Sequence, residues 1–359
     1  MTDFRRIVSG QDRSERAHAI RAAAWLARLP YAAAIAARNL AYDRGWKTIH
    51  RGGVPVISVG NLTVGGTGKT PAVALFCRKI RSLGLRVAIV SRGYAANSSG
   101  VNDEALELEL QLPDVPHVQS PDRVAAVRIA VEELETETIV MDDGFQHRRL
   151  HRELDIVLID ATNPWGHNKL LPRGLLREPV SSLARADVAI ATRSDQVGPA
   201  ALEAIRTRVM RHSPACVWAT AVHAPAQLRG VGGAVEPLEL LRGRRCFVFS
   251  GIGNPDAFAA TVESAGAQLA GRLDFPDHHA FAAEDIERLR TDIERLVRSD
   301  SSFAGERGLL VLCTGKDLTK VNLQRLAGRP LYSLDIALRL TSGEAQVDAA
   351  LARAVTCPS

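Results

Sequence analysis

Short apolar runs rich in β-branched residues alternate with helical stretches from residue 54 onward. The first runs predict strands at residues 54–60, 86–93, 138–144, 155–162 and 187–195, each ending in small or polar residues. Continuous apolar runs separated by helical crossovers are typical of a parallel sheet covered on both faces. The pattern therefore predicts an α/β fold whose ligands bind at the carboxyl ends of the strands.

A stretch rich in Gly and Pro near residues 225–243 indicates a change of domain. Further apolar runs at 246–255, 267–279, 309–317 and 329–338 predict a second, smaller α/β domain. We therefore expect three parts along the chain. They are a basic helical segment at residues 1–50, a core domain at 51–232 and a carboxy-terminal domain at 233–359.

The charge distribution isolates the amino-terminal segment. The chain has a formal net charge of +5, but residues 1–51 carry ten basic and four acidic side chains, so the other 308 residues carry a net charge of −1. A basic excess confined to one short segment does not favour nucleic acid as the partner. The five cysteines lie singly, as in reduced cytosolic proteins, so neither zinc nor disulfides are expected.

Residues 17–47 are rich in Ala and Leu, with arginines at intervals. The longest uncharged stretch, Leu29 to Ala37, has nine residues, whereas a spanning helix needs about 20. No cleavable signal peptide is apparent. Two interpretations are equally supported: a helix lying in the headgroup region of an anionic leaflet through residues such as Trp25 and Leu26, or simply the first helix of the globular fold.

The strongest motif is a Gly-rich loop between an expected strand and an expected helix. It reads GNLTVGGTGKTP from Gly60 to Pro71, with Thr63 where the common phosphate-binding pattern has Gly. Its backbone amides would face phosphate oxygens, Lys69 would reach the β- and γ-phosphates, and the Thr70 hydroxyl would bind Mg²⁺. The expected nucleotide-binding residues in this loop are Thr63, Val64, Gly65, Gly66, Thr67, Gly68, Lys69 and Thr70.

The loop alone does not define the reaction. Val64 argues against the ATPases that have a lysine at this position. Asp142-Asp143-Gly144 is one residue too short for a GTPase switch, and residues 192–195 carry Arg193 where a guanine-reading motif has lysine. These features favour an enzyme that uses ATP.

Acidic and histidine residues suggest where the metal and the acceptor would lie. Asp142 and Asp143 end an expected strand, which is where such proteins place a Mg²⁺ ligand, although Asp143 could instead cap a helix. The pair Asp103-Glu104 and the histidines of FPDHH at 275–279 would by themselves be ordinary surface loops. Arg148 and Arg149 either meet a substrate phosphate or face solvent.

The ordered set of motifs resembles the tetraacyldisaccharide 4′-kinase family of Gram-negative bacteria. The motifs are GNLTVGGTGKTP (60–71), SRGY (91–94), DE (103–104), DDGFQHRRL (142–150), LLPRGLLREP (170–179), FSGIGNPDAF (249–258), FPDHH (275–279) and GKD (315–317). The resemblance implies transfer of the ATP γ-phosphate to the 4′-hydroxyl of an acylated glucosamine disaccharide 1-phosphate. It also implies a peripheral or monotopic location on the cytoplasmic face of the inner membrane, with no obligate protein partner.

The resemblance also assigns roles to individual residues. Asp103 and His278 match a dyad that activates the sugar hydroxyl, and Arg123 matches a basic residue of the nucleotide site. The residues matched to the metal are Thr70, Asp142, Asp143, Glu104 and Glu178. The chain departs from the family pattern at Ala105, where proline is more common, and at Gly315, where glutamate is common.

Two other classes stay open on sequence grounds. One is a membrane-associated GTPase or ATPase switch, and the other is a non-catalytic nucleotide-binding module. The expected fold is a P-loop parallel-sheet domain with a second, smaller α/β domain and an amino-terminal helix at the membrane surface.

Overall fold

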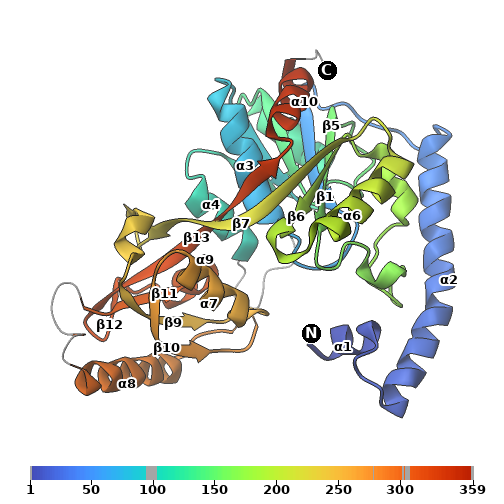
Figure 1. The fold of residues 1–359 in the computed structure, drawn as a ribbon. Helices are drawn as coiled ribbons and strands as arrows, with labels where there is room; N and C mark the ends of the chain where they lie inside the picture. The colour runs from blue at the N-terminus through green and yellow to red at the C-terminus, as the bar shows by residue number, and fades with distance from the viewer. Residues whose placement is uncertain (1, 94–102, 278, 301–302, 304–307, 357–359) are drawn as a thin grey trace. The chain divides into compact units, whose positions relative to one another are not determined.

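The computed structural model describes residues 2–93, 103–277, 279–300, 303 and 308–356 (Figure 1). The chain forms two compact units. Unit 1 comprises Met1–Asn102, Gln111–His223 and Leu338–Ser359, and unit 2 comprises Asp103–Leu110 and Ala224–Ala337.

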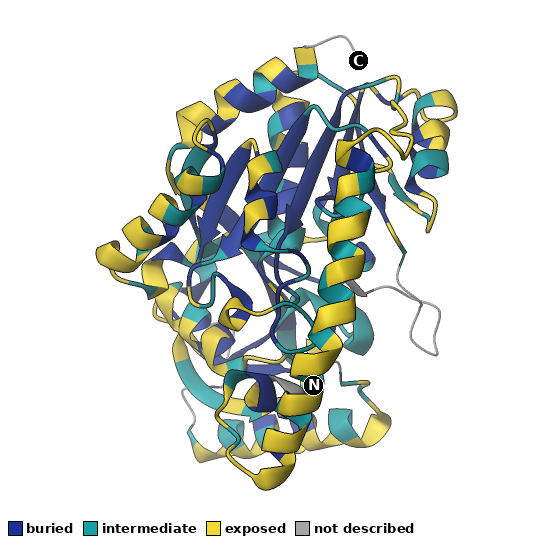
Figure 2. Cartoon of the chain, turned by 90° about the vertical axis from the view of Figure 1, so that its right-hand side faces the viewer, coloured by how far each residue is buried: buried dark blue, intermediate teal, exposed yellow. Residues whose placement is uncertain are grey.

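Unit 1 contains a parallel sheet whose strand order is β7-β6-β5-β1-β4-β2-β3. The strands of this unit are β1 (Val56–Asn61), β2 (Val87–Ser91), β3 (His117–Gln119), β4 (Thr138–Asp142), β5 (Leu154–Asp160), β6 (Val188–Thr192) and the part of β7 (Val217–Arg229) up to His223. Every residue of β1, β2, β4 and β6 is buried, as the continuous apolar runs require (Figure 2). The predicted α/β class is confirmed.

Unit 1 also contains helices. They are α1 (Thr2–Ser9), α2 (Glu15–Asp43), α3 (Lys69–Ser82), α5 (Arg123–Glu132), α6 (Pro199–His212) and α10 (Glu344–Thr356), with short 3₁₀ turns η1 (Gly166–Asn168), η2 (Val180–Arg185) and η3 (Ser194–Gln196). Side-chain caps define two of the starts: Ser14 accepts from the Ala17 amide and Asp122 accepts from Val124 and Ala125. The crossover helices place the loops that follow β1 and β4 at one edge of the sheet.

Unit 2 is a smaller α/β unit with the parallel order β10-β9-β11-β13. Its elements are α4 (Asp103–Gln111), β8 (Val235–Glu236), η4 (Leu238–Leu241), β9 (Arg245–Ser250), α7 (Pro255–Ser264), β10 (Gln268–Asp274), α8 (Ala283–Ser299), β11 (Leu310–Cys313), α9 (Gly315–Val321), β12 (Arg325–Leu326) and the part of β13 (Arg329–Ser342) up to Ala337. The strands expected here from the apolar runs are present.

One long strand was not expected. β7 extends into the first residues of the stretch at 225–243 that the sequence indicated as a change of domain, and only four of its thirteen residues are buried. It contains His223 and Pro225 and lacks the continuous apolar run that identified the other strands, because much of its surface is only half-buried. Pairing with neighbouring strands stabilises such a strand more than its own pattern of apolar residues does.

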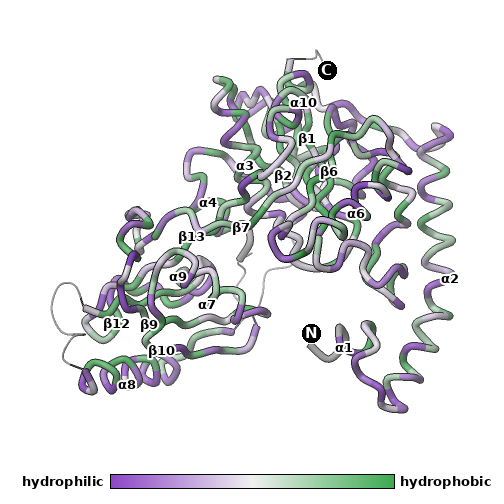
Figure 3. The backbone as a smooth tube through the Cα atoms, viewed as in Figure 1, coloured by the Kyte–Doolittle hydropathy of each residue, from purple (hydrophilic) through white to green (hydrophobic). Residues whose placement is uncertain are grey.

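The amino-terminal segment forms α2, a helix of 29 residues that continues through Pro30. Ala17 and Tyr42 are buried, whereas Trp25, Leu26 and Leu29 are 47%, 61% and 49% exposed. Figure 3 shows apolar and polar bands alternating along this helix. Among the described residues, no helix is both long enough and apolar enough to cross a membrane. α2 is thus a part of unit 1 that also exposes large apolar side chains.

Candidate active site

The Gly-rich loop joins the buried end of β1 to the start of α3. Gly68 precedes Lys69 with a left-handed φ of 87°, and Gly65 has a φ of 128°. A Cβ atom at Gly68 would lie 2.3 Å from Nε2 of His223. Both the backbone conformation and the neighbouring imidazole therefore require glycine at position 68.

Side chains of Asn61, Thr192 and Arg193 donate hydrogen bonds to groups of this loop. Buried Asn61 donates from Nδ2 to the Thr63 carbonyl at 2.7 Å and to the Thr67 hydroxyl at 2.8 Å. The Thr192 hydroxyl donates to the Thr67 carbonyl at 3.0 Å, and Arg193 donates to the Gly66 carbonyl at 2.9 Å. The loop is therefore preorganised at the amino terminus of α3, where helix and loop amides form a phosphate-binding concavity.

Asp142 and Asp143 lie beside the loop because β4 pairs with β1. Val59 pairs with Asp142 in the parallel register, so both strands end at the same edge. Asp142 is buried, and Asp143 follows it in the left-handed region with a φ of 51°. The structure thus brings the predicted acidic pair to the phosphate-binding loop.

The Asp143 carboxylate is surrounded by cations. One oxygen lies 3.8 Å from Nζ of Lys69, and Nη1 of Arg177 donates to the two oxygens at 2.6 and 2.8 Å. Burial raises the pKa of Asp143, but the charges of Lys69 and Arg177 outweigh it and hold the pKa below its usual value. A turn rather than a helix follows Asp143, so its carboxylate forms these ion pairs and does not cap a helix.

A cavity of about 470 Å³ opens next to this cluster within unit 1. Its lining includes Tyr31, Arg38, Arg92, Arg123, Asp143 and Arg177. Arg123 also donates to the backbone carbonyl of Asp143 at 2.9 Å. Four arginines around one carboxylate make this cavity suited to an anionic ligand.

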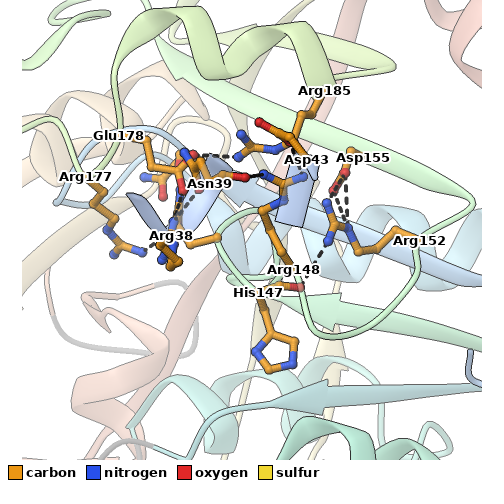
Figure 4. Close-up of polar contacts among 12 residues, drawn as sticks. Arg38, Asn39, Asp43, His147, Arg148, Arg152, Asp155, Arg177, Glu178 and Arg185 are labelled. Atoms are coloured by element: carbon orange, nitrogen blue, oxygen red, sulfur yellow. Dashed lines mark hydrogen bonds and ion pairs between the residues drawn. The ribbon is translucent and has the colours of Figure 1, made fainter. Parts of the chain in front are cut away.

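Glu178 lies fully buried between two arginines (Figure 4). Its carboxylate forms ion pairs with Arg38 of α2 and with Arg185 of η2, the latter at 2.5 Å. Two guanidinium groups already neutralise this carboxylate in the structure. The expected link between Glu178 and a metal stays a prediction.

Arg148 and Arg149, left open by the sequence, have different surroundings. Arg148 pairs with Asp43 at 2.7 Å and donates to the Asn39 carbonyl at 3.1 Å, so it binds the end of α2 (Figure 4). Arg149 is half-exposed, 3.9 Å from Asp122. Arg148 is therefore a packing contact between α2 and the DDGFQHRRL segment.

The predicted hydroxyl-activating dyad lies outside what the structure describes. This applies to the side chains of Asp103 and Glu104 and to residue 278 as a whole. The adjacent His279 is described: it stacks on Phe275 with ring centroids 4.8 Å apart, and Nε2 lies 2.9 Å from Oδ2 of Asp285. His279 is thus engaged in holding its loop.

Sequence reasoning missed several residues that shape the site. Arg177 stands inside the LLREP motif, which could have drawn attention to it. His223, by contrast, carried no local signal, because its role depends on β7 passing behind Gly68. The residues missed are Tyr31, Arg38, Asn61, Arg177, Arg185, Thr192, Arg193 and His223.

Over the described ranges, no three His, Cys, Asp or Glu side chains gather closely enough to form a metal cluster. A site that shares a cation with nucleotide phosphates uses only one or two protein oxygens, and the Thr70 hydroxyl and Asp142 carboxylate are donors of that chemistry. The residues present therefore fit Mg²⁺ bound together with a nucleotide.

The site consists of a strand, a Gly-rich loop and a helix, with acidic residues at the end of the neighbouring strand. These features define a P-loop phosphotransferase. The sequence model of the tetraacyldisaccharide-1-P 4′-kinase family matches residues 20–356, and the chain belongs to this family. It is a kinase of lipid A biosynthesis.

Curated relatives and a solved structure agree with this assignment. Proteins named tetraacyldisaccharide 4′-kinase from Anaeromyxobacter sp. (strain K) and Geobacter sulfurreducens are 39% and 33% identical, covering 92% and 94% of this chain and 90% and 94% of their own. The crystal structure of LpxK from Aquifex aeolicus in complex with ATP superposes with a TM-score of 0.73 at 28% identity. The match covers 94% of this chain and 99% of that one.

Buried histidines make the stability of unit 1 dependent on pH. Burial lowers the pKa of His117, His147 and His223 to about 4, from 6.5 for a free histidine. Between these values the unfolded chain binds protons that the folded chain does not, so the free energy of unfolding falls as pH is lowered from 6.5 towards 4.

Urea denaturation at pH 7 and pH 5 measures this effect. His117→Gln is expected to reduce the pH-dependent loss by about 2 kcal/mol or less. An equal pH dependence in wild type and His117→Gln contradicts the assignment.

Proposed function

We propose that this protein transfers the γ-phosphate of ATP to the 4′-hydroxyl of a tetraacylated glucosamine disaccharide 1-phosphate. The observation that carries the proposal is the preorganised phosphate loop with Lys69 beside Asp143, in a chain that belongs to the 4′-kinase family. Relatives named for this activity and an ATP complex of a homologous structure support it.

The nucleotide would occupy the loop from Thr63 to Thr70. The amides at the start of α3 would bind the phosphates, and Lys69 would neutralise charge on the β- and γ-oxygens. Arg123, already directed at the Asp143 carbonyl, is close enough to this edge to contribute a further cation.

Mg²⁺, when bound, neutralises charge on the phosphate oxygens and orients them. The Thr70 hydroxyl and the Asp142 carboxylate would hold it, and Glu104 and Glu178 remain further predicted ligands. Asp143 suits a positioning role, since Arg177 and Lys69 already bind its carboxylate.

The segment that approaches a guanine-reading motif contacts the phosphate loop. Arg193 stands where a guanine-reading motif has lysine. Its guanidinium pairs with Asp160 and donates to the Gly66 carbonyl at 2.9 Å. Arg193 therefore supports the phosphate loop.

Asp103 and His278 would act on the acceptor. Phosphoryl transfer has a loose transition state, so the attacking hydroxyl needs orientation and a group that accepts its proton late in the step. A histidine beside a carboxylate supplies that group near neutral pH. Because His279 is held by Phe275 and Asp285, His278 is the histidine of this loop that we assign to the chemistry.

The exposed side chains of α2 would bind the lipid surface. Trp25, Leu26 and Leu29 protrude from a helix that lies within the basic segment at residues 1–50, a combination suited to an anionic leaflet. ATP and the anionic leaflet meet on the cytoplasmic face of the inner membrane. We therefore place the enzyme there as a peripheral protein.

Replacement of Lys69 tests the phosphate-binding role. With [γ-³²P]ATP and the acylated disaccharide 1-phosphate, wild type is expected to yield labelled lipid, and Lys69→Met to lower kcat by about 100-fold or more, since a preorganised cation is lost. Lys169→Met, at an exposed lysine, serves as the control. Labelled lipid at the wild-type rate from Lys69→Met removes the lysine from the mechanism.

Replacement of the dyad tests the acceptor side. Asp103→Asn and His278→Gln are expected to lower the single-turnover rate by about 100-fold or more, while the dissociation constant for ATP stays near that of wild type. His279→Gln should instead lower the melting temperature, because it loses the bond to Asp285. If His279→Gln abolishes turnover without a stability loss and His278→Gln does not, the two assignments must be exchanged.

Replacement of the exposed apolar side chains tests the lipid contact. The triple variant Trp25→Ser, Leu26→Ser, Leu29→Ser is expected to bind anionic vesicles at least about tenfold more weakly, because it loses buried apolar area. Val235→Ser, at a residue 50% exposed in unit 2, is the matched control. Equal sedimentation of the triple variant and wild type with vesicles would reject α2 as the lipid-binding element.

A further inference from the structure

Two side chains on one face of α2 hold one short segment of unit 1. The Tyr31 hydroxyl donates to the backbone carbonyl of Arg177 at 2.8 Å, and Arg38 forms an ion pair with Glu178. Tyr31 and Arg38 are seven residues apart, so they share a face of the helix. Arg177 and Glu178 are consecutive. Two side chains of α2 therefore contact two neighbouring residues of this segment.

The contact at Glu178 is energetically strong. Its carboxylate is fully buried, and Arg185 is the other partner at 2.5 Å. Removing one partner of a buried ion pair leaves an incompletely compensated charge, which is strongly unfavourable. The position of residue 178 thus depends on Arg38.

Arg177 connects the same segment to the phosphate loop. Its guanidinium binds both oxygens of Asp143, whose carboxylate lies 3.8 Å from Lys69. Its backbone amide donates to the Leu62 carbonyl at 2.7 Å. A displacement of residues 177 and 178 would therefore move both the carboxylate beside Lys69 and the start of the loop.

We infer that Tyr31 and Arg38 are positioning residues that act through Arg177 to keep Asp143 and Lys69 in their catalytic arrangement. The inference rests on the proposed kinase function. Trp25, Leu26 and Leu29 of the same helix are exposed. The helix that we place on the lipid surface is thus also the helix that aligns the catalytic cations, so binding to lipid and ordering of the site involve one element.

Steady-state kinetics of the full chain in mixed micelles test the positioning role. Arg38→Gln is expected to lower kcat about tenfold or more, with KM for ATP and for the lipid acceptor within about twofold of wild type. Arg38→Lys should recover part of kcat. Arg211→Gln, which removes an exposed arginine from α6 of the same unit, should leave all three constants unchanged. A raised KM for the acceptor with unchanged kcat would make Arg38 a substrate-binding residue and overturn the inference.

A double-mutant cycle tests the route through Arg177. In an Arg177→Gln background, Arg38→Gln should lower kcat no further, because the connection is already broken. If the two losses multiply, Arg38 does not act through Arg177.

Hydrogen exchange gives a readout that needs no activity. In Arg38→Gln, peptides covering residues 170–179 should exchange faster than in wild type and in Arg211→Gln, because the hydrogen bond from the Arg177 amide to the Leu62 carbonyl opens more often. Unchanged exchange overturns the inference. Absence of labelled lipid from wild type instead overturns the proposed function, so the two failures are distinct.

Tyr31→Phe provides a milder variant should Arg38→Gln fail to fold. It removes one hydroxyl and keeps the ring. We expect a kcat about two- to threefold below wild type and faster exchange in the same peptides. Wild-type kcat and exchange in Tyr31→Phe would overturn the role of Tyr31.

Discussion

The loops at the end of β1 and β4 are held in place by the carboxylate of Asp143. It is largely buried, and an isolated buried carboxylate would be strongly unfavourable, so its charge requires Lys69 and Arg177. The same two ion pairs locate the lysine at the start of α3 and the LLREP segment that carries the arginine. Neutralising the Asp143 carboxylate thus brings together three segments that are far apart in sequence. It also holds the Lys69 ammonium group where negative charge on a phosphate would develop.

A second buried carboxylate extends this dependence to the amino-terminal helix. Glu178 has two arginine partners, one from η2 and one from α2, and the adjacent Arg177 is the partner of Asp143. The two clusters therefore share a short segment of backbone. The sequence left two interpretations of residues 17–47 open, and the structure shows a helix that belongs to unit 1. The helix is anchored in unit 1 on one face while Trp25, Leu26 and Leu29 protrude from it.

Much of the fold and part of the site could be predicted from the sequence. Apolar runs located the buried strands because a strand covered on both faces needs apolar residues at every position. The same pattern failed for β7, whose half-buried residues do not form such a run. The phosphate loop and the acidic pair were predictable because their chemistry is local: glycines permit the turn, and Asp142 and Asp143 follow directly on a strand.

By itself, the sequence determined the fold class, the phosphate-binding loop and, through its ordered motifs, the family, since each depends on residues close together in the chain. Only the tertiary structure decided what those residues contact. Asp143 binds Arg177 because β4 and the LLREP segment meet at one edge, and His223 requires glycine at position 68 because β7 passes behind the loop. Glu178 is neutralised by an arginine 140 positions away. No sequence spacing encodes such pairs, because they arise when distant segments bury their charges together.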